Sequence, residues 1–309
     1  MITALCGGVG GSKLIDGLFR ILAEDELTVI GNTADDLVYM GLRVCPDLDT
    51  VTYTLAGMAG EKGWGIADDS FDALSMLERY GAPSWFRLGD RDLATSIYRS
   101  DQLRQGVGLA DVTADLLTAL GVKARLVPMT EDRVGTRLLV GGDWLHFQDY
   151  FVRRAHRDRV EAVRYAAIER AAIGAGILEA LTDAEAVVLV NSNPVLSILP
   201  ILSVPGMRDL VASVQSPVVA VSPLIGSAAV SGPAGELMSI VGKPPTATGV
   251  AALYSDFING IVIDQQDAEQ RREIEDLGLA VMVTDTIMSD GAGRERLARA
   301  VLDFAHSLA

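Results

Sequence analysis

The stretch ITALCGGVGGSKLIDGL (residues 2–18) decides how this chain folds. It begins with a short apolar run (2–6), passes through four glycines within residues 7–11, and continues with apolar side chains at helical spacing: Leu14, Leu18, Ile21 and Leu22. This order predicts a strand, a tight loop and a helix. Residues without a Cβ let backbone N–H groups approach phosphate oxygens closely, and the start of a helix adds partial positive charge. The sequence therefore predicts a loop that binds a phosphate-bearing ligand.

The glycine loop matches neither of the two common nucleotide-binding patterns. The pattern GxxxxGK[ST] requires a glycine before the lysine, whereas Lys13 follows Ser12. The pattern GxGxxG fails because Lys13 stands where its third glycine belongs. The predicted second strand (27–30) also leads to Asn32 and not to an acidic residue that binds a ribose. A nicotinamide-dependent oxidoreductase is therefore disfavoured, and the other alternative is an ordinary turn between strand and helix.

The rhythm of strand and helix continues in the second half of the chain. Short apolar runs predict strands at 186–190, 218–221, 260–263 and 279–283. Helical patterns separate them, at 206–213, 248–258, 266–277 and 291–307. Such alternation predicts an α/β fold with a doubly wound, mostly parallel, Rossmann-like sheet, in which the loops at the carboxyl ends of the strands face one crevice.

The middle of the chain, residues 60–180, differs from this rhythm. Helical patterns occur around 68–80 and 108–120, a strand pair is predicted at 124–128 and 136–146, and a long helix is predicted near 159–181. The run Val140-Gly141-Gly142-Asp143 indicates a hairpin turn. We interpret residues 60–180 as a mixed α/β cap or insertion over the crevice, within a single domain of residues 1–309.

Composition excludes several classes of protein. The formal net charge of −15 repels polyanions, and the sequence lacks a basic patch, so no nucleic-acid partner is expected. Cys6 and Cys45 have neither CxxC nor Cys/His ligand spacing, which favours reduced thiols in a cytoplasmic protein. No signal-peptide pattern and no apolar run of membrane-spanning length is present, so no membrane partner is expected.

Acidic residues gather after the second predicted strand and before the next helix. Asp35 and Asp36 follow the strand, and the segment Pro46-Asp47-Leu48-Asp49-Thr50 precedes a helix predicted at 50–56. Carboxylates at strand ends beside a phosphate loop suit a hard divalent cation, and Mg²⁺ is the ion expected. The alternative is that Asp47 or Asp49 caps the helix.

Three further segments have the composition of ligand-binding loops. Residues 85–95 (WFRLGDRDLAT) crowd aromatic, cationic and acidic side chains without a simple amphipathic period. The run Asn191-Ser192-Asn193-Pro194 follows a strand, and its alternative interpretation is N-capping by Asn193. Residues 222–226 and 231–234 (SPLIG and SGPA) follow the next strand, so both loops could reach one nucleotide. His146 is interpreted as a strand residue that packs or lines the crevice, because the three histidines lack ligand spacing.

Seven ordered blocks carry a resemblance to a known family: GGVGGSKLIDGL (7–18), NTADD (32–36), GLRVCPDLDT (41–50), WFRLGDRDLATSIYR (85–99), WLHFQDYFVRR (144–154), NSNPVLSI (191–198) and VSPLIGSAAVSGPA (221–234). With these blocks the chain resembles the 2-phospho-L-lactate transferases of coenzyme F-420 biosynthesis, called CofD in archaea and FbiA in mycobacteria. The resemblance implies a magnesium-dependent transfer. In it, the ribityl 5′-hydroxyl of 7,8-didemethyl-8-hydroxy-5-deazariboflavin attacks the phosphorus of a guanosine diphosphate-activated acid, GMP leaves, and F-420-0 or its dehydro form results.

The resemblance also implies roles for individual residues. It implies that the phosphates lie near Gly8, Gly10, Gly11 and Lys13. It implies that Asp36 and Asp49 hold the metal, that Asp49 is catalytic, and that the deazaflavin contacts Asp49, Arg87 and Arg91. It implies that the guanosine lies near Asn193, Ser197 and Ser222. A homodimer is expected from the relatives.

Two points in the blocks depart from the family, and one other function competes. Residues 197–201 (SILPI) replace a glycine-bearing run, and Ser96 stands where relatives often have histidine. The competing function is a non-catalytic regulator of the gluconeogenesis-factor type that binds a nucleotide sugar; the PDLDT and LGDRDLAT segments favour the enzyme. The sequence leaves open whether the donor carries lactate, enolpyruvate or glycerate, and whether a carboxylate or the metal alone activates the acceptor.

Overall fold

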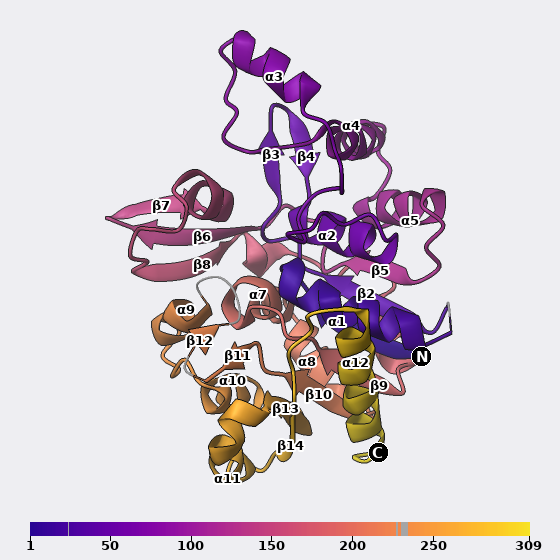
Figure 1. Ribbon diagram of the computed structural model, residues 1–309, viewed down its shortest axis with the longest axis vertical. Coiled ribbons are helices and arrows are strands. Elements are labelled where there is room, and N and C mark those ends of the chain that lie inside the picture. Colours follow the sequence, from indigo (N-terminus) through magenta and orange to yellow (C-terminus); the bar gives the residue numbers. More distant parts are fainter. Residues whose placement is uncertain (24, 227, 230–233) are drawn as a thin grey trace.

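A seven-stranded parallel sheet forms the centre of the part of the chain described by the computed structural model, residues 1–23, 25–226, 228–229 and 234–309 (Figure 1). In spatial order its strands are β14 (Ala280–Thr284), β13 (Gly260–Asp264), β10 (Val218–Val221), β9 (Ala186–Leu189), β1 (Ile2–Cys6), β2 (Leu27–Gly31) and β5 (Arg125–Pro128). The predicted doubly wound, Rossmann-like α/β fold is confirmed.

Helices cover both faces of this sheet, which explains why its strands are largely apolar. Along β1, Ala4 and Cys6 face one core cluster, whereas Leu5 faces the other. The first face packs against α1 (Gly8–Ile21), α2 (Pro46–Leu55), α5 (Leu109–Ala119) and α12 (Gly291–His306). The second face packs against α6 (Ile177–Thr182), α7 (Leu199–Ser203), α8 (Met207–Ser213), α9 (Ala234–Ile240), α10 (Ala247–Tyr254) and α11 (Arg271–Glu275).

The strand order places a topological switch point beside β1. The chain runs outward from β1 to β2 and β5, and then returns to β9 on the opposite side of β1. Because the loops after β1 and β9 leave the sheet in different directions, a crevice opens between them at the carboxyl ends of the strands. The glycine loop and residues 190–193 therefore border the same crevice.

Two groups of inserted elements lie outside the central sheet. The first contains the hairpin β3 (Leu37–Tyr39) and β4 (Leu42–Val44), helix α3 (Asp72–Arg79) and helix α4 (Asp90–Arg104), at the top of Figure 1. The second is an antiparallel sheet with the order β7 (Asp143–His146), β6 (Gly135–Val140) and β8 (Ala162–Ala166), on the left of the figure. A π-helical turn (Asp149–Arg153) follows β7.

The remaining elements are short. They are the π-helical turn Pro194–Ile198, the 3₁₀ turns Ile168–Arg170 and Gln265–Gln270, and the strand pair β11 (Leu224–Ile225) and β12 (Ala228–Ala229). Among the described residues, no single helix is long and apolar enough to cross a membrane. One pair of helical segments, Pro194–Ser203 and Met207–Ser213, has the length and composition of a membrane span when taken together, but the two segments meet at an angle of 87°.

The predicted pairing of strands 124–128 and 136–146 is wrong. Residues 125–128 pair with β2 in the central sheet, and residues 135–146 form the hairpin of β6 and β7 by themselves. Leu126 and Val127 are both buried, one against each face of the sheet, which suits a central sheet better than a surface pair. The predicted hairpin turn at 140–143 is confirmed.

The predicted long helix near 159–181 is also wrong. This segment holds β8, a 3₁₀ turn and the short helix α6. Ala167 adopts a left-handed φ of 64°, which ends β8 and directs the chain into the turn. Gly174 lies so close to the central sheet that a Cβ there would come within 2.1 Å of the Pro128 carbonyl oxygen. A continuous helix cannot follow this path.

Candidate functional site

The glycine loop leads from β1 directly into helix α1. Gly8 begins the helix with a φ of 65°, in the left-handed region that favours glycine. The preceding Gly7 accepts a hydrogen bond on its carbonyl oxygen from Ser192 Oγ (2.7 Å). The N-cap residue of α1 makes no side-chain hydrogen bond, and the Gly8 N–H interacts with Asp47, so the start of the helix presents its N–H groups to the crevice beside this carboxyl group.

Gly10 and Gly11 allow α1 to pack closely against the segment after β9. A Cβ at Gly11 would lie 2.1 Å from Ser192 Oγ, and one at Gly10 would lie 3.2 Å from the Asn191 carbonyl oxygen. These two glycines therefore fix the position of the helix start, whatever ligand it binds. Lys13, predicted near the phosphates, lies further along α1 and is partly buried.

Helix α2 brings two aspartates to the crevice. It begins at Pro46, four residues before the predicted start, because proline suits the first helical position. Asp47 and Asp49 therefore lie in the first turn, and neither caps the helix, since the N-cap is Cys45 and accepts no side-chain hydrogen bond. The capping interpretation is wrong for both aspartates.

Asp47 lies beside the glycine loop. Asn32 Nδ2 donates a hydrogen bond to Asp47 Oδ2 (2.8 Å), and a Cβ at Gly7 would come within 2.5 Å of the same oxygen. Burial raises the pKa of Asp47 to about 7, against the opposing effect of the Asn32 hydrogen bond. Burial, reinforced by Asp47, also raises the pKa of Asp35 well above its ordinary value. The loop thus faces carboxyl groups that hold protons readily.

The two predicted metal ligands each contact an arginine. Asp49 accepts hydrogen bonds from both Nη atoms of the buried Arg99, with 3.2 Å between Nη1 and Oδ2. Asp36 Oδ2 accepts from Arg43 Nη2 (3.0 Å) and Cys45 Sγ (3.0 Å). Burial raises the pKa of Asp36 to about 6, although Arg43 opposes this shift.

A cavity of about 560 Å³, here called the aromatic cavity, opens beside this acidic group. Asp47, Asp49 and Tyr53 lie at its acidic end. Its aromatic walls come from Trp64, Phe71, Trp85, Phe86, Phe147 and Phe151. Tyr53 donates a hydrogen bond to Asp92 (2.8 Å), and burial followed by the nearby Asp49 raises the pKa of Asp92 to about 7. The cavity can therefore enclose a flat ring system whose polar substituents meet carboxyl groups.

The segment 85–95 is only partly the predicted loop, because helix α4 starts at Asp90. The helix shows no amphipathic period since it buries polar side chains, Ser96, Arg99 and Ser100, and not an apolar stripe. Arg87 lines the aromatic cavity, with its guanidinium 4.6 Å from the centre of the Phe71 ring. Arg91 instead contacts Asp69, donating from its backbone N–H (2.9 Å).

The predicted nucleotide-binding residues follow β9 and β10. Asn193 caps the turn Pro194–Ile198, accepting from the N–H groups of Val195 (3.0 Å) and Leu196 (3.1 Å), so N-capping is confirmed. Ser197 is buried, and a Cβ at Gly7 would lie 2.7 Å from its Cβ, which places it against the glycine loop. Ser222 is buried at the end of β10. Of the predicted segment 231–234, residues 231–233 lie outside the described part of the chain.

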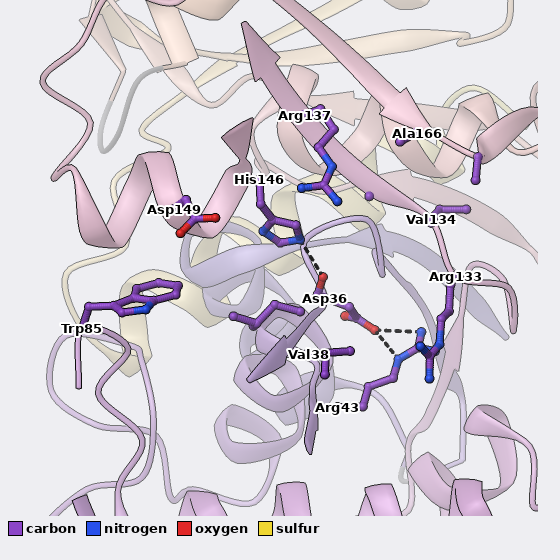
Figure 2. A pocket seen from close by; sticks show the side chains of 13 residues that line it. Asp36, Val38, Arg43, Trp85, Arg133, Val134, Arg137, His146, Asp149 and Ala166 are labelled. Atoms are coloured by element: carbon purple, nitrogen blue, oxygen red, sulfur yellow. Dashed lines mark hydrogen bonds and ion pairs between the residues drawn. The ribbon is translucent and has the colours of Figure 1, made fainter. Parts of the chain in front are cut away.

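A second cavity of about 510 Å³, here called the arginine pocket, lies between β3 and the sheet of β6, β7 and β8. Arg43, Arg133 and Arg137 line it, together with His146 (Figure 2). His146 ends β7, and its Nε2 lies 3.0 Å from the Asp36 carbonyl oxygen. Burial and the neighbouring Arg137 lower the pKa of His146. The interpretation of His146 as a strand residue is confirmed, and the cavity that it lines is the arginine pocket.

Sequence reasoning did not assign roles to Arg99, Tyr53 or the aromatic residues outside 85–95. Arg99 ends the block 85–99, but nothing in the sequence indicates that it is buried against Asp49. Among the described residues, no group of three or more His, Cys, Asp and Glu side chains is arranged to hold a metal ion. The Mg²⁺ site therefore stays a prediction.

Comparison with known proteins adds a family to this geometry. A family model described as 2-phospho-L-lactate transferase CofD matches residues 2–298. The chain is 41% identical over 315 residues to a phosphoenolpyruvate transferase of Kitasatospora aureofaciens, covering 99% of this chain and 98% of the relative. It is 40% identical over 297 residues to a 2-phospho-L-lactate transferase of Methanosarcina mazei, covering 96% and 97%. A crystal structure of a UPF0052 family member from Bacillus halodurans shares the fold, with a TM-score of 0.65, 13% identity, and 97% and 98% of the two chains covered.

Proposed function

Since the chain belongs to the 2-phospho-L-lactate transferase CofD family, we propose that it transfers a phospholactyl or phosphoenolpyruvyl group from a guanosine diphosphate-activated donor to the 5′-hydroxyl of 7,8-didemethyl-8-hydroxy-5-deazariboflavin. The products are GMP and F-420-0 or its dehydro form. One observation carries the proposal. Asp47 lines the aromatic cavity and also touches the glycine loop, so an acceptor and a phosphate-bearing donor can meet at this residue.

The aromatic cavity suits the deazaflavin. Its walls present ring faces and edges to a flat conjugated system, and Arg87 adds a cation next to Phe71. The ribityl chain then extends toward the acidic end, where Asp49 and Asp47 accept hydrogen bonds from hydroxyl groups. This orientation brings the 5′-hydroxyl to the glycine loop. Arg91, which contacts Asp69 on the cavity wall, supports the ring from outside.

The glycine loop suits the diphosphate of the donor. The N–H groups at the start of α1 and the partial positive charge of that helix would stabilise phosphate oxygens. The guanosine extends past Asn193 and Ser197 toward Ser222, along the carboxyl ends of β9 and β10. Displacement at phosphorus depends mainly on positioning and charge neutralisation, which such a loop provides.

Asp47 and Asp49, at the acidic end of the aromatic cavity, differ in what they can do for the acceptor hydroxyl. Asp49, the predicted catalytic residue, is held by both Nη atoms of Arg99, so it positions hydroxyl groups rigidly. Asp47 has no arginine partner among the described residues, and its pKa of about 7 suits a proton acceptor near neutral pH. The proposal therefore assigns proton acceptance to Asp47 and positioning to Asp49.

Mg²⁺ is part of the proposal, and the acidic residues fit it in one respect. Oδ1 of Asp35 and Oδ1 of Asp36 are buried without a hydrogen-bond partner among the described residues, so a cation would satisfy oxygens that nothing else does. Because no three such side chains of the described residues are arranged around one point, Asp36 and Asp49 are the side chains proposed to hold it, with the remaining ligands supplied by the substrate. Mg²⁺ binds to few carboxylates when substrate phosphates supply further ligands, and there it would neutralise charge on the phosphates.

A titration of both substrates tests the proposal. The deazaflavin is a conjugated ring system, so its fluorescence reports on its binding to the protein. GDP with Mg²⁺ is titrated as the second ligand. Saturable binding of both in one complex is expected. If the protein were instead a regulator of the gluconeogenesis-factor type, it would bind a nucleotide sugar and would not bind the deazaflavin. That result would contradict the proposal. The expected homodimer is checked in the same sample by light scattering.

A further inference from the structure

Of the residues that line the arginine pocket, the transfer reaction proposed above uses Asp36 and Trp85 and leaves the basic side chains without a role. Trp85 is the residue common to the linings of the arginine pocket and the aromatic cavity. Figure 2 shows Arg137 and His146 on one side of Asp36, and Arg43 and Arg133 on the other. The pocket therefore presents basic side chains from several elements to one volume of about 510 Å³.

The strand register explains how these side chains come together. Arg137 in the central strand β6 pairs with His146 of β7 on one side and with Arg164 of β8 on the other. Residues directly opposite one another in a sheet point to the same face, so these three basic residues form a row. Like charges in such a row destabilise a sheet, and no carboxylate occupies a place in it. The sheet thus keeps a costly arrangement on the face that lines the pocket.

The charge in the pocket is not balanced from within. Asp36 is already paired with Arg43, and the other acidic lining residue, Asp149, lies 3.9 Å from Arg153 outside the pocket. The side chains of Arg133 and Arg137 have no hydrogen-bond or ion-pair partner among the described residues. Two unpaired guanidinium groups facing one cavity are notable in a chain whose net charge is −15.

The floor of the pocket leaves room for a ligand between these groups. Gly135 and Ala166, a cross-strand pair next to Arg137, both line it. A Cβ at Gly135 would meet nothing closer than Arg137 Nε at 4.0 Å, so glycine is not needed there for packing. Small side chains at these two positions keep the space in front of Arg137 open.

We propose that the arginine pocket binds an oxyanion, a carboxylate or phosphate group, between Arg133 and Arg137. Guanidinium groups bind such anions through paired N–H donors, and Arg133 and Arg137 supply them without Arg43, which is paired with Asp36. The anion has two possible sources, the acid end of the transferred group or a separate small metabolite. Binding itself does not depend on the proposed transferase activity.

Binding of inorganic phosphate to the whole protein tests this proposal, with chloride balancing the ionic strength. The chain has three histidines, so ¹⁵N-labelled imidazole spectra report on His146 locally, assigned with His146→Gln. Saturable phosphate-dependent shifts of His146 are expected. In Arg133→Gln/Arg137→Gln the affinity should fall about tenfold or more. Arg164→Gln, which removes an equal charge from the same sheet face outside the pocket, should keep the affinity within about twofold.

Phosphate that binds at the glycine loop does not affect the comparison of His146 shifts between variants, because that loop is the same in every variant. Absence of saturable His146 shifts, or equal shifts in the double variant and the parent, would overturn the proposal. Steady-state kinetics then identify the source of the anion. A donor KM raised about tenfold in the double variant, with the acceptor KM unchanged, assigns the pocket to the acid end of the donor. If the donor KM and the acceptor KM are both unchanged, the arginine pocket is assigned to a separate anion. If the protein shows no turnover, the phosphate measurement still decides whether the site exists.

Discussion

Arg99 and Asp49 form a buried ion pair in which both Nη atoms of the arginine meet the carboxylate, across the contact between α4 and α2. Arg99 is 1% exposed and Asp49 is 5% exposed. Arg99 also reaches the Arg43 carbonyl oxygen through Nη1 (3.4 Å). The pair therefore joins the aromatic cavity to the base of the β3–β4 hairpin.

Removing Arg99 should destabilise the protein strongly. Arg99→Met leaves Asp49 buried without its cation, so the free energy of unfolding should fall by about 3–5 kcal/mol. Arg104→Met in the same helix removes an exposed arginine paired with Asp101, and should change it by less than about 1 kcal/mol. Urea unfolding followed by circular dichroism measures both. A similar fall in the free energy of unfolding for the two variants would show that the buried ion pair contributes no more to stability than the exposed one.

The raised pKa of Asp47 predicts a dependence of stability on pH. Its folded pKa of about 7 exceeds the ordinary value of about 4, so the stability tied to its protonated form is present below about pH 4 and is lost as pH rises through about 7. Asp47→Asn does not titrate. Between pH 5 and pH 8, in chelator, the parent should lose about 2 kcal/mol of unfolding free energy relative to the variant. A difference that stays constant with pH would mean that Asp47 titrates normally.

The close packing of the glycine loop predicts unequal effects for two helical glycines. Gly11→Ala would place its Cβ 2.1 Å from Ser192 Oγ, so the helix start must move, at a cost of about 1–3 kcal/mol, and GDP affinity should fall. Gly235→Ala in α9 would meet only Pro245 Cβ at 3.5 Å, and should be neutral or stabilising by up to about 1 kcal/mol. Thermal unfolding and GDP titration check both variants. If both substitutions left stability and GDP affinity unchanged, Gly11 would not pack against Ser192 as closely as described.

Trp64 tests the use of the aromatic cavity. It lines that cavity and is 46% exposed, so Trp64→Ala should preserve the fold while weakening deazaflavin binding about tenfold. Trp144→Ala removes another partly exposed tryptophan, one that lines neither cavity, and should leave the affinity unchanged. Fluorescence titration with the deazaflavin compares them. A larger effect at Trp144 would contradict this location of the acceptor.

The strands and helices of the central sheet could be predicted because both of their signals are local. Buried parallel strands appear as apolar runs such as 218–221, and the helices between them have an apolar period. The errors arose where the partner of a segment is distant in sequence. Residues 125–128 pair with β2, far back in the chain, and β8 pairs with β6 where a helix was predicted.

The residues of the candidate site could be predicted where they lie together in one short segment of the sequence. The glycine loop, Asp47 and Asp49, and the Asn193 turn were all found in short motifs. Their partners were not, because Arg99 reaches Asp49 from a different helix and the arginine pocket depends on strand register. Such contacts between segments require the folded arrangement, which no single motif specifies.

Turnover tests the central claim most directly. The protein is incubated with 7,8-didemethyl-8-hydroxy-5-deazariboflavin, Mg²⁺ and the guanosine diphosphate derivative of lactate or of enolpyruvate, and GMP and the deazaflavin product are quantified by liquid chromatography and mass spectrometry. The account predicts GMP and the phosphorylated deazaflavin in equal amounts with at least one donor, and a strong loss in Asp47→Asn. A folded protein that binds both substrates but releases no GMP with either donor would contradict it.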